Sequence, residues 1–234
     1  MRSSTHAVIF DLDGTLLDHV GSVTSALCKW LPTLGVTLAD EFVAAWFDAE
    51  KRHFPAWCSG EISFAEQRRR RLRDFLPLLG VTPGDDDALN AVFAGYLSCY
   101  EAAWTKFDDV DPAVTELGRL GVQTAVLTNG TIEQQTAKLN AVGLHGQLGP
   151  VFTAEALGAA KPDPRTFLTV CDVLGVEPES ATNVGDLYDL DVLAPRAAGL
   201  NAVYLDRQDA GPYDEPCRIT SLRQLPGQLH VDQG

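Results

Sequence analysis

The feature that most constrains the fold of this chain is an alternation of short apolar runs with segments of helical periodicity. The runs are β-branched and typical of buried parallel strands: residues 7–10, 122–127, 181–184 and 201–205. The helical segments cover residues 112–120, 131–142, 164–174 and roughly 189–198. A glycine follows each helical segment closely, where a left-handed cap is expected: Gly121, Gly143, Gly175 and Gly199. This alternation predicts an α/β fold with a doubly wound, Rossmann-like parallel sheet.

Residues 17–106 interrupt the alternation. This stretch contains three or four helical segments and no convincing strand. Ser63 and Glu66 have the spacing of a capping box that opens one of these helices. We therefore expect an α/β core from residues 1–16 and 107–234, with an inserted, all-helical cap domain from residues 17–106. We expect no internal repeat in the chain.

The charge of the chain limits its partners. Its 234 residues include 18 Lys and Arg against 32 Asp and Glu, which gives a net charge of −14. Such a surface repels phosphate backbones and anionic lipid headgroups, so we expect neither nucleic acid nor a membrane as a partner. The N-terminal residues lack a secretory signal pattern, and the five scattered cysteines form no CxxC pair. We expect a cytoplasmic protein, and the sequence leaves its oligomeric state open.

Polar residues follow three of the predicted strands, and a lysine lies in a loop between strands. They are Asp11 and Asp13 after the first strand, Thr128 and Asn129 after the second, Asp186 and Asp191 after the third, and the loop residue Lys161. In an open parallel sheet the carboxyl ends of the strands form the ligand-binding edge, so these side chains should converge. A carboxylate cluster needs a cation, and Mg²⁺ prefers carboxylate oxygens together with water and phosphate oxygens. The pattern predicts Mg²⁺-dependent phosphoryl chemistry at this edge.

The residue types also suggest individual roles. Asp11 can act as a nucleophile and form an aspartyl-phosphate. Asp13, two residues further on, can exchange a proton with the leaving group or with incoming water. Lys161 offers a positive charge to Asp11 and to phosphoryl oxygens, and Thr128 offers a hydroxyl. Positioning and charge neutralisation supply most of the catalysis in phosphoryl transfer, and these residues fit both tasks.

Four short motifs, in this order, resemble those of the haloacid dehalogenase-like hydrolase superfamily. They are Asp-Leu-Asp-Gly-Thr at 11–15, Thr-Asn-Gly at 128–130, Lys-Pro at 161–162 and Gly-Asp-Leu-Tyr-Asp-Leu-Asp at 185–191. The resemblance covers the whole chain, and the insert lies where that family places its helical cap. The dehalogenase branch lacks the second acid of the first motif, so the presence of Asp13 favours phosphate esters.

The resemblance implies a role for each motif residue. Asp11 would be the nucleophile and Asp13 the acid/base. Thr128, Asn129 and Lys161 would bind the phosphate of the substrate. The metal would be held by Asp11, Asp186 and the carbonyl oxygen of Asp13, with Asp191 as a supporting acid beside Lys161.

An arginine cluster in the insert suggests a contact to the substrate. The apolar stripe of the helix that follows Ser63, extended backward, puts Arg68 on its centre line. We expect Arg68 to contact the part of the substrate remote from the transferred phosphate; the alternative is an ion pair with an acid of the insert such as Glu101. Residues 60–71 are also similar to caps of the nucleotidase and acylneuraminate-phosphatase branch.

Together these observations predict a Mg²⁺-dependent phosphatase that acts on a small soluble phosphate monoester. One alternative is a phosphomutase of the same superfamily, which keeps water away from the phosphoenzyme. The other is a non-catalytic protein that binds a phosphorylated ligand on the same scaffold. The sequence does not identify the ester.

Overall fold

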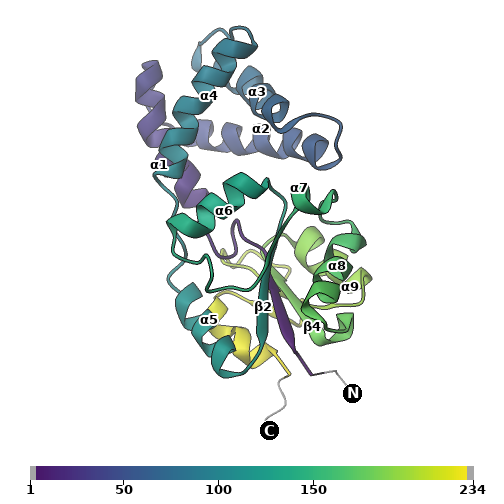
Figure 1. Ribbon diagram of the computed structural model, residues 1–234. Coiled ribbons are helices and arrows are strands. Elements are labelled where there is room, and N and C mark those ends of the chain that lie inside the picture. The colour runs from purple at the N-terminus through teal and green to yellow at the C-terminus, as the bar shows by residue number, and fades with distance from the viewer. Residues whose placement is uncertain (1–3, 231–234) are drawn as a thin grey trace. The chain divides into compact units, whose positions relative to one another are not determined.

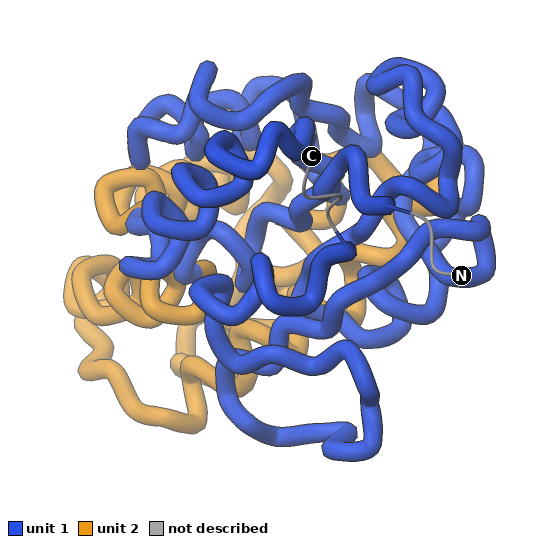
Figure 2. Tube along the Cα trace, turned by 90° about the horizontal axis from the view of Figure 1, so that it is seen from below, with its two compact units in different colours: residues 1–18, 105–234 blue, residues 19–104 orange. Residues whose placement is uncertain are grey.

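A computed structural model describes residues 4–230 of the chain, which divides into two compact units (Figure 2). One unit comprises residues 1–18 and 105–234, and the other comprises residues 19–104. These boundaries lie two residues away from the expected ones. The reason is a short pairing between the two chain crossings: Leu17 and Lys106 form an antiparallel bridge, and the amide of Asp18 donates to the carbonyl of Thr105 at 3.0 Å.

A parallel sheet of six strands forms the centre of the first unit. Its order is β3-β2-β1-β4-β5-β6, and every pairing is parallel. The strands are β1 (Ala7–Phe10), β2 (Gln123–Thr128), β3 (Val151–Thr153), β4 (Ala181–Gly185), β5 (Asn201–Leu205) and β6 (Arg218–Ile219). The predicted parallel α/β fold is confirmed. The sequence pattern does not predict β3 and β6, because strands of three and two residues show no alternation.

Helices cover both faces of this sheet (Figure 1). They are α5 (Val110–Arg119), α6 (Ile132–Ala141), α7 (Ala154–Leu157), α8 (Pro164–Leu174), α9 (Ala194–Ala197) and the short helical turns η3 (Pro178–Ser180), η4 (Tyr188–Leu193) and η5 (Leu222–Gln228). Successive side chains of β1 point to opposite faces: Val8 and Phe10 pack with α5, α6 and η5, whereas Ile9 packs with α8 and α9. The helix expected over roughly 189–198 is divided into a π-helical turn, η4, and α9, where Pro195 is an early residue.

The second unit, residues 19–104, is described throughout and contains no strand. Its helices are α1 (His19–Trp30), α2 (Asp40–Cys58), α3 (Phe64–Phe75) and α4 (Asp86–Glu101), with the 3₁₀ turns η1 (Leu31–Leu34) and η2 (Leu76–Leu79). Aromatic rings fill its core. The ring centroid of Trp46 lies 4.3 Å from that of Tyr96 and 5.0 Å from that of Phe75. Ser63 caps α3 by accepting from the amide of Glu66 at 3.1 Å. The expected capping box is only half formed, because the Glu66 carboxylate accepts from three arginines of the helix, Arg69, Arg70 and Arg73. Between residues 4 and 230, no helix has both the length and the apolar character needed to cross a membrane.

The helical unit contains a repeated turn, so the expectation that the chain has no internal repeat is wrong. Residues 30–37 and 75–82 share Leu, Pro, Leu, Gly, Val and Thr at the same positions. In both copies an α-helix passes into a 3₁₀ turn, η1 or η2, and then into a glycine with positive φ. The rings of Trp30 and Phe75, which open the two copies, stack with their centroids 6.3 Å apart.

The positive φ of the glycine after η2 gives a test of this turn. Gly80 has φ +72°, and a side chain there is strained, so Gly80→Ala should lower the free energy of unfolding by about 1–2 kcal/mol. Gly95, inside α4 of the same unit, is the matched control, because an added Cβ meets only the side chain of Trp30 at 3.4 Å or more. Gly95→Ala should raise the free energy of unfolding by about 0.5–1 kcal/mol. Urea unfolding followed by tryptophan fluorescence measures both changes, and equal effects of the two variants would contradict this description of the turn.

Candidate functional site

The carboxyl edge of the sheet brings the predicted site residues of the first unit together. Asp11 directly follows β1, Thr128 is the last residue of β2, and Asp186 directly follows β4. The amide of Asp11 donates to the carbonyl of Val184 at 2.9 Å, which extends the β1–β4 pairing to this residue. The parallel register therefore fixes the backbone position of Asp11 at the edge of the sheet.

A buried lysine links two of the carboxylates. The Nζ of Lys161 donates to Oδ1 of Asp11 at 2.7 Å and to Oδ1 of Asp191 at 2.6 Å. Lys161 is 4% exposed and Asp191 is fully buried. Burial alone lowers the pKa of Lys161, but the two adjacent carboxylates outweigh it and raise the pKa above its ordinary value. Lys161 therefore keeps its charge, which compensates the buried acids.

Asn129 holds the backbone of this lysine. Its Nδ2 donates to the carbonyl of Lys161 at 2.9 Å, and the amide of Lys161 donates to its Oδ1 at 2.8 Å. Both polar atoms of the Asn129 side chain are thus engaged with one residue, which suits a role in positioning Lys161. A direct contact of Asn129 with substrate stays a prediction.

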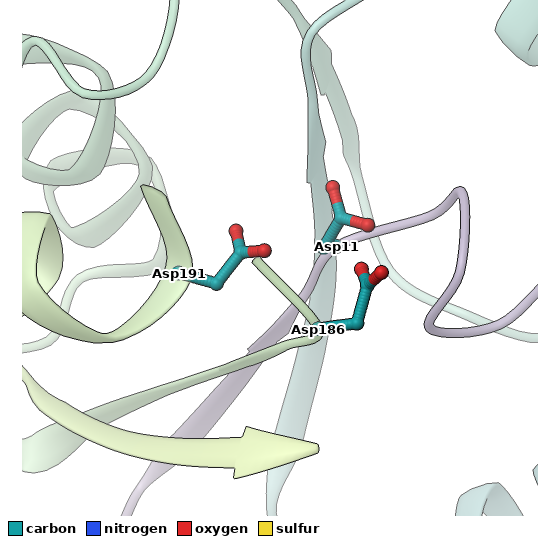
Figure 3. A group of neighbouring side chains, drawn as sticks. All are labelled: Asp11, Asp186 and Asp191. Carbon is teal, nitrogen blue, oxygen red and sulfur yellow. The ribbon is translucent and has the colours of Figure 1, made fainter. Parts of the chain in front are cut away.

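Three carboxylates form the acidic cluster of the site (Figure 3). Oxygens of Asp11, Asp186 and Asp191 lie within 4.8 Å of one another. Burial raises the pKa of Asp11 to about 7, because the lost hydration and the charge of Asp191 outweigh Lys161. Burial, with the charges of Asp11 and Asp191, raises the pKa of Asp186 to about 8. The cluster therefore holds more negative charge than the protein compensates.

Two of these carboxylates are suited to a metal ion. Oδ1 of Asp11 accepts from Lys161, and Oδ1 of Asp186 accepts from Thr15 at 3.3 Å. The other oxygen of each carboxylate accepts no hydrogen bond from another described residue. Asp191 differs, since its Oδ1 accepts from Lys161 and its Oδ2 accepts from the amide of Leu187 at 3.0 Å. Hard carboxylate oxygens with uncompensated charge fit a divalent cation such as Mg²⁺, with Asp11 and Asp186 as ligands and Asp191 as a support.

Two glycines make room for the carboxylates. Gly14 has φ +88°, and a Cβ there would lie 2.3 Å from Oδ2 of Asp186. A Cβ on Gly185 would lie 2.3 Å from Cγ of Asp191. Both contacts are shorter than real Cβ contacts allow, so each glycine lets a carboxylate lie directly against the backbone.

The second predicted acid, Asp13, has partners that the sequence analysis does not identify. The Nζ of Lys138 donates to Oδ1 and Oδ2 of Asp13 at 2.8 and 2.6 Å. The Nε2 of Gln135 donates to Oδ2 of Asp13 at 3.2 Å and to Oγ1 of Thr128 at 2.7 Å. A sequence signal exists: Gln135 and Lys138 lie three residues apart and share the buried side of α6 with Leu139, where polar residues need partners.

The arginine cluster of α3 differs from expectation. The arginine on the buried face is Arg71, and its Nη2 lies 2.7 Å from Oε2 of Glu50. Arg68 is half-buried, and its guanidinium lies 4.3 Å from the ring centre of Phe64 and 5.0 Å from that of Phe93. Placing Arg68 at the centre of the buried face is therefore wrong, since the stripe passes through position 71. A contact between Arg68 and substrate stays a prediction.

Comparison with known proteins supplies further observations. A family model described as haloacid dehalogenase-like hydrolase matches residues 5–199. Ribulose-1,5-bisphosphate 5-phosphatase of Halopiger xanaduensis is 30% identical over 93% of this chain and 92% of its own. Phosphoserine phosphatase of Thermus thermophilus is 38% identical over 51% of this chain, which spans about half of that relative, 49%.

Solved structures agree in fold. The HAD-hydrolase YfnB of Bacillus subtilis, solved bound to magnesium, superposes with a TM-score of 0.82 at 21% identity, covering 98% of this chain and 100% of the other. A dehalogenase structure gives a TM-score of 0.77 at 26% identity, covering 99% and 100% of the two chains. The likeness extends over both units of the chain.

The raised pKa values of Asp11 and Asp186 predict how the stability of the metal-free protein depends on pH. Both groups bind a proton more tightly in the folded than in the unfolded chain, whose carboxyls titrate near 3.8. Their stabilising contribution is complete below about pH 4 and is lost as the pH rises through about 7 to 8. In EDTA, the free energy of unfolding should therefore fall between pH 5 and pH 9 less steeply in Asp186→Asn than in the wild type. Asp189→Asn, an exposed acid nearby, should keep the wild-type slope, and equal slopes in all three proteins would contradict the assignment.

Proposed function

Because this chain belongs to the haloacid dehalogenase-like hydrolases, we propose that it hydrolyses a small phosphate monoester through an aspartyl-phosphate on Asp11, with Mg²⁺ held by Asp11 and Asp186. The resemblance inferred from four motifs is confirmed, and with it the hydrolase class. Relatives that match most of the chain are named as phosphatases, of ribulose 1,5-bisphosphate and of phosphoglycolate. These names support phosphate-ester chemistry, and they suggest small phosphorylated metabolites as substrates.

The observation that carries the proposal is the state of the Asp11 carboxylate. Lys161 binds Oδ1 at 2.7 Å, whereas Oδ2 has no donor among the described residues. Oδ2 can therefore attack the phosphorus atom, while Oδ1, which accepts from Lys161 and keeps a second lone pair, would be the Asp11 oxygen that serves the metal. Lys161 fixes the orientation of the carboxylate and offers charge to the phosphoryl oxygens. When bound, Mg²⁺ supplies the positive charge that lets Asp11 and a phosphate dianion approach each other.

Asp13 completes the two half-reactions. This cycle begins with Asp13 protonated. As the bond between Oδ2 of Asp11 and phosphorus forms, the bond from phosphorus to the ester oxygen breaks, and Asp13 gives that oxygen its proton. Asp13 then removes a proton from water, whose oxygen attacks phosphorus and releases Asp11 and inorganic phosphate. A carbon–halogen bond leaves a halide that needs no proton, so a positioned second acid favours esters although dehalogenases share the fold.

The cysteines fit the proposed compartment. None of the five lies in a disulfide bond, as is usual in a reducing cytoplasm. We propose the cytoplasm, where small phosphorylated metabolites are available.

Loss of the nucleophile tests the mechanism. Asp11→Asn keeps the shape of the side chain but removes the attacking charge, so turnover should fall by about a thousandfold or more. The measurement is release of inorganic phosphate from a panel of small esters, including phosphoglycolate and phosphoserine, with Mg²⁺ present. Release of phosphate by the wild type also separates a phosphatase from a phosphomutase. If Asp11→Asn retained more than a few per cent of activity, the aspartyl-phosphate route would be excluded.

Removal of the metal tests the role of Asp186. Exhaustive chelation should abolish phosphate release, and Mg²⁺ should restore it, because Asp11, Asp186 and a phosphate dianion repel one another without a cation. Asp186→Asn should raise the Mg²⁺ concentration for half-maximal activity at least tenfold, whereas the control Asp189→Asn should leave it unchanged. Full activity in the chelated wild type would refute the metal requirement.

A further inference from the structure

Lys138 makes an unusual ion pair with the second acid of the site. Its Nζ contacts both oxygens of Asp13, at 2.8 and 2.6 Å, although the two residues lie 125 positions apart. The side chain of Lys138 is 4% exposed and that of Asp13 is 26% exposed. This ion pair differs from one on the surface. Because the aliphatic stem of Lys138 is buried, its ammonium group cannot turn away from Asp13 into solvent as that of a surface lysine can.

Gln135 adds a second donor from the same helix. Its single Nε2 atom donates to Asp13 and to the hydroxyl of Thr128, and the residue is 2% exposed. The Oε1 atom of Gln135 is buried and has no hydrogen-bond partner in the described part of the chain. The orientation of the amide group therefore depends on the two hydrogen bonds that Nε2 donates. A Cβ on Gly130 would lie 2.5 Å from Nε2, so the lack of a side chain at Gly130 leaves room for the amide group of Gln135.

Helix α6 therefore connects two parts of the site. It begins just after the Thr128–Gly130 segment, and Thr131 caps it by accepting from the amide of Gln134 at 3.4 Å. Gln135 and Lys138 are one turn apart and lie on the same side of the helix. Two side chains of α6 thus contact the Asp13 carboxylate and orient it.

The two acids are held in different ways. Lys161 takes one oxygen of Asp11 and leaves the other for attack, whereas Lys138 takes both oxygens of Asp13. We propose that Lys138 and Gln135 are positioning residues that hold the Asp13 carboxylate in place for its proton transfers and fix it relative to Thr128. The inference rests on the proposed phosphatase function and assigns to it two residues outside the four motifs.

The test compares esters with good and poor leaving groups. The ester oxygen of phenyl phosphate needs a proton as it leaves, whereas that of p-nitrophenyl phosphate leaves readily without one. Lys138→Met keeps the buried stem and removes the charge. The measured quantity is kcat/KM, because it covers the steps up to and including departure of the leaving group. Lys138→Met should lower kcat/KM at least tenfold more for phenyl phosphate than for p-nitrophenyl phosphate.

Further variants separate positioning from other roles. Gln135→Met removes both donated hydrogen bonds at similar volume and should shift the same ratio in the same direction. Lys138→Arg should recover part of the lost activity on phenyl phosphate. Lys106→Met is the matched control, since Lys106 also pairs with an aspartate, Asp111 at 2.7 Å, and the ratio should stay unchanged.

The outcomes are distinct. Equal losses on both esters in Lys138→Met would assign Lys138 to phosphate binding and overturn the positioning role, as would wild-type values for both. If Lys138→Met does not fold, as judged by circular dichroism, Gln135→Met decides between the same results. A wild-type protein that hydrolyses neither ester nor any other phosphate monoester would overturn the proposed function itself, and the positioning role with it.

Discussion

The contact on which the site depends is the ammonium of Lys161 between Asp11 and Asp191. Without it, two carboxylates would be buried next to each other with no compensating charge, which is far costlier than a surface ion pair. Much of the surrounding structure holds this lysine: Asn129 binds both polar groups of its backbone, and Asp191 is fixed by the amide of Leu187. The sheet contributes the other partner, because the β1–β4 pairing continues to Asp11.

One lysine does not neutralise the cluster. Asp186 lies within the same group of oxygens and keeps a raised pKa, and Asp13 needs a second buried lysine, Lys138. When all four carboxylates are ionised, as binding to a metal requires of its ligands, the two ammonium groups leave an excess of negative charge that matches one divalent cation. The proposed Mg²⁺ requirement thus follows from the charge balance of the site as well as from the choice of ligand atoms.

Short-range sequence patterns predict the longer strands and the site residues at their ends. The sequence predicts that Asp11 and Thr128 lie at strand ends, because an apolar run of four to six residues identifies each strand without any tertiary information. Lys138 could not be assigned to Asp13 in the same way, since 125 residues separate them and only the packing of α6 joins them.

The errors of prediction have equally physical causes. The choice between Arg68 and Arg71 depends on the phase of a helix, and a small error in phase moves the buried face from one residue to another. The strands β3 and β6 form because neighbouring strands offer hydrogen bonds, although their own sequences are too short to predict them. The repeated turn gives a weak sequence signal, because its two copies are short and lie far apart in the chain.

The close fit between glycines and polar side chains has an evolutionary consequence. Gly14 lies against Asp186, Gly185 against Asp191 and Gly130 against Gln135, each so closely that a side chain on the glycine would displace its neighbour. We therefore expect each glycine and its neighbour to be inherited as a pair. A lineage that replaces such a glycine must first change its partner, and changing Asp186 or Asp191 alters the chemistry before any space is gained. We therefore expect these motifs to vary together rather than residue by residue, because backbone and functional group occupy adjacent volumes.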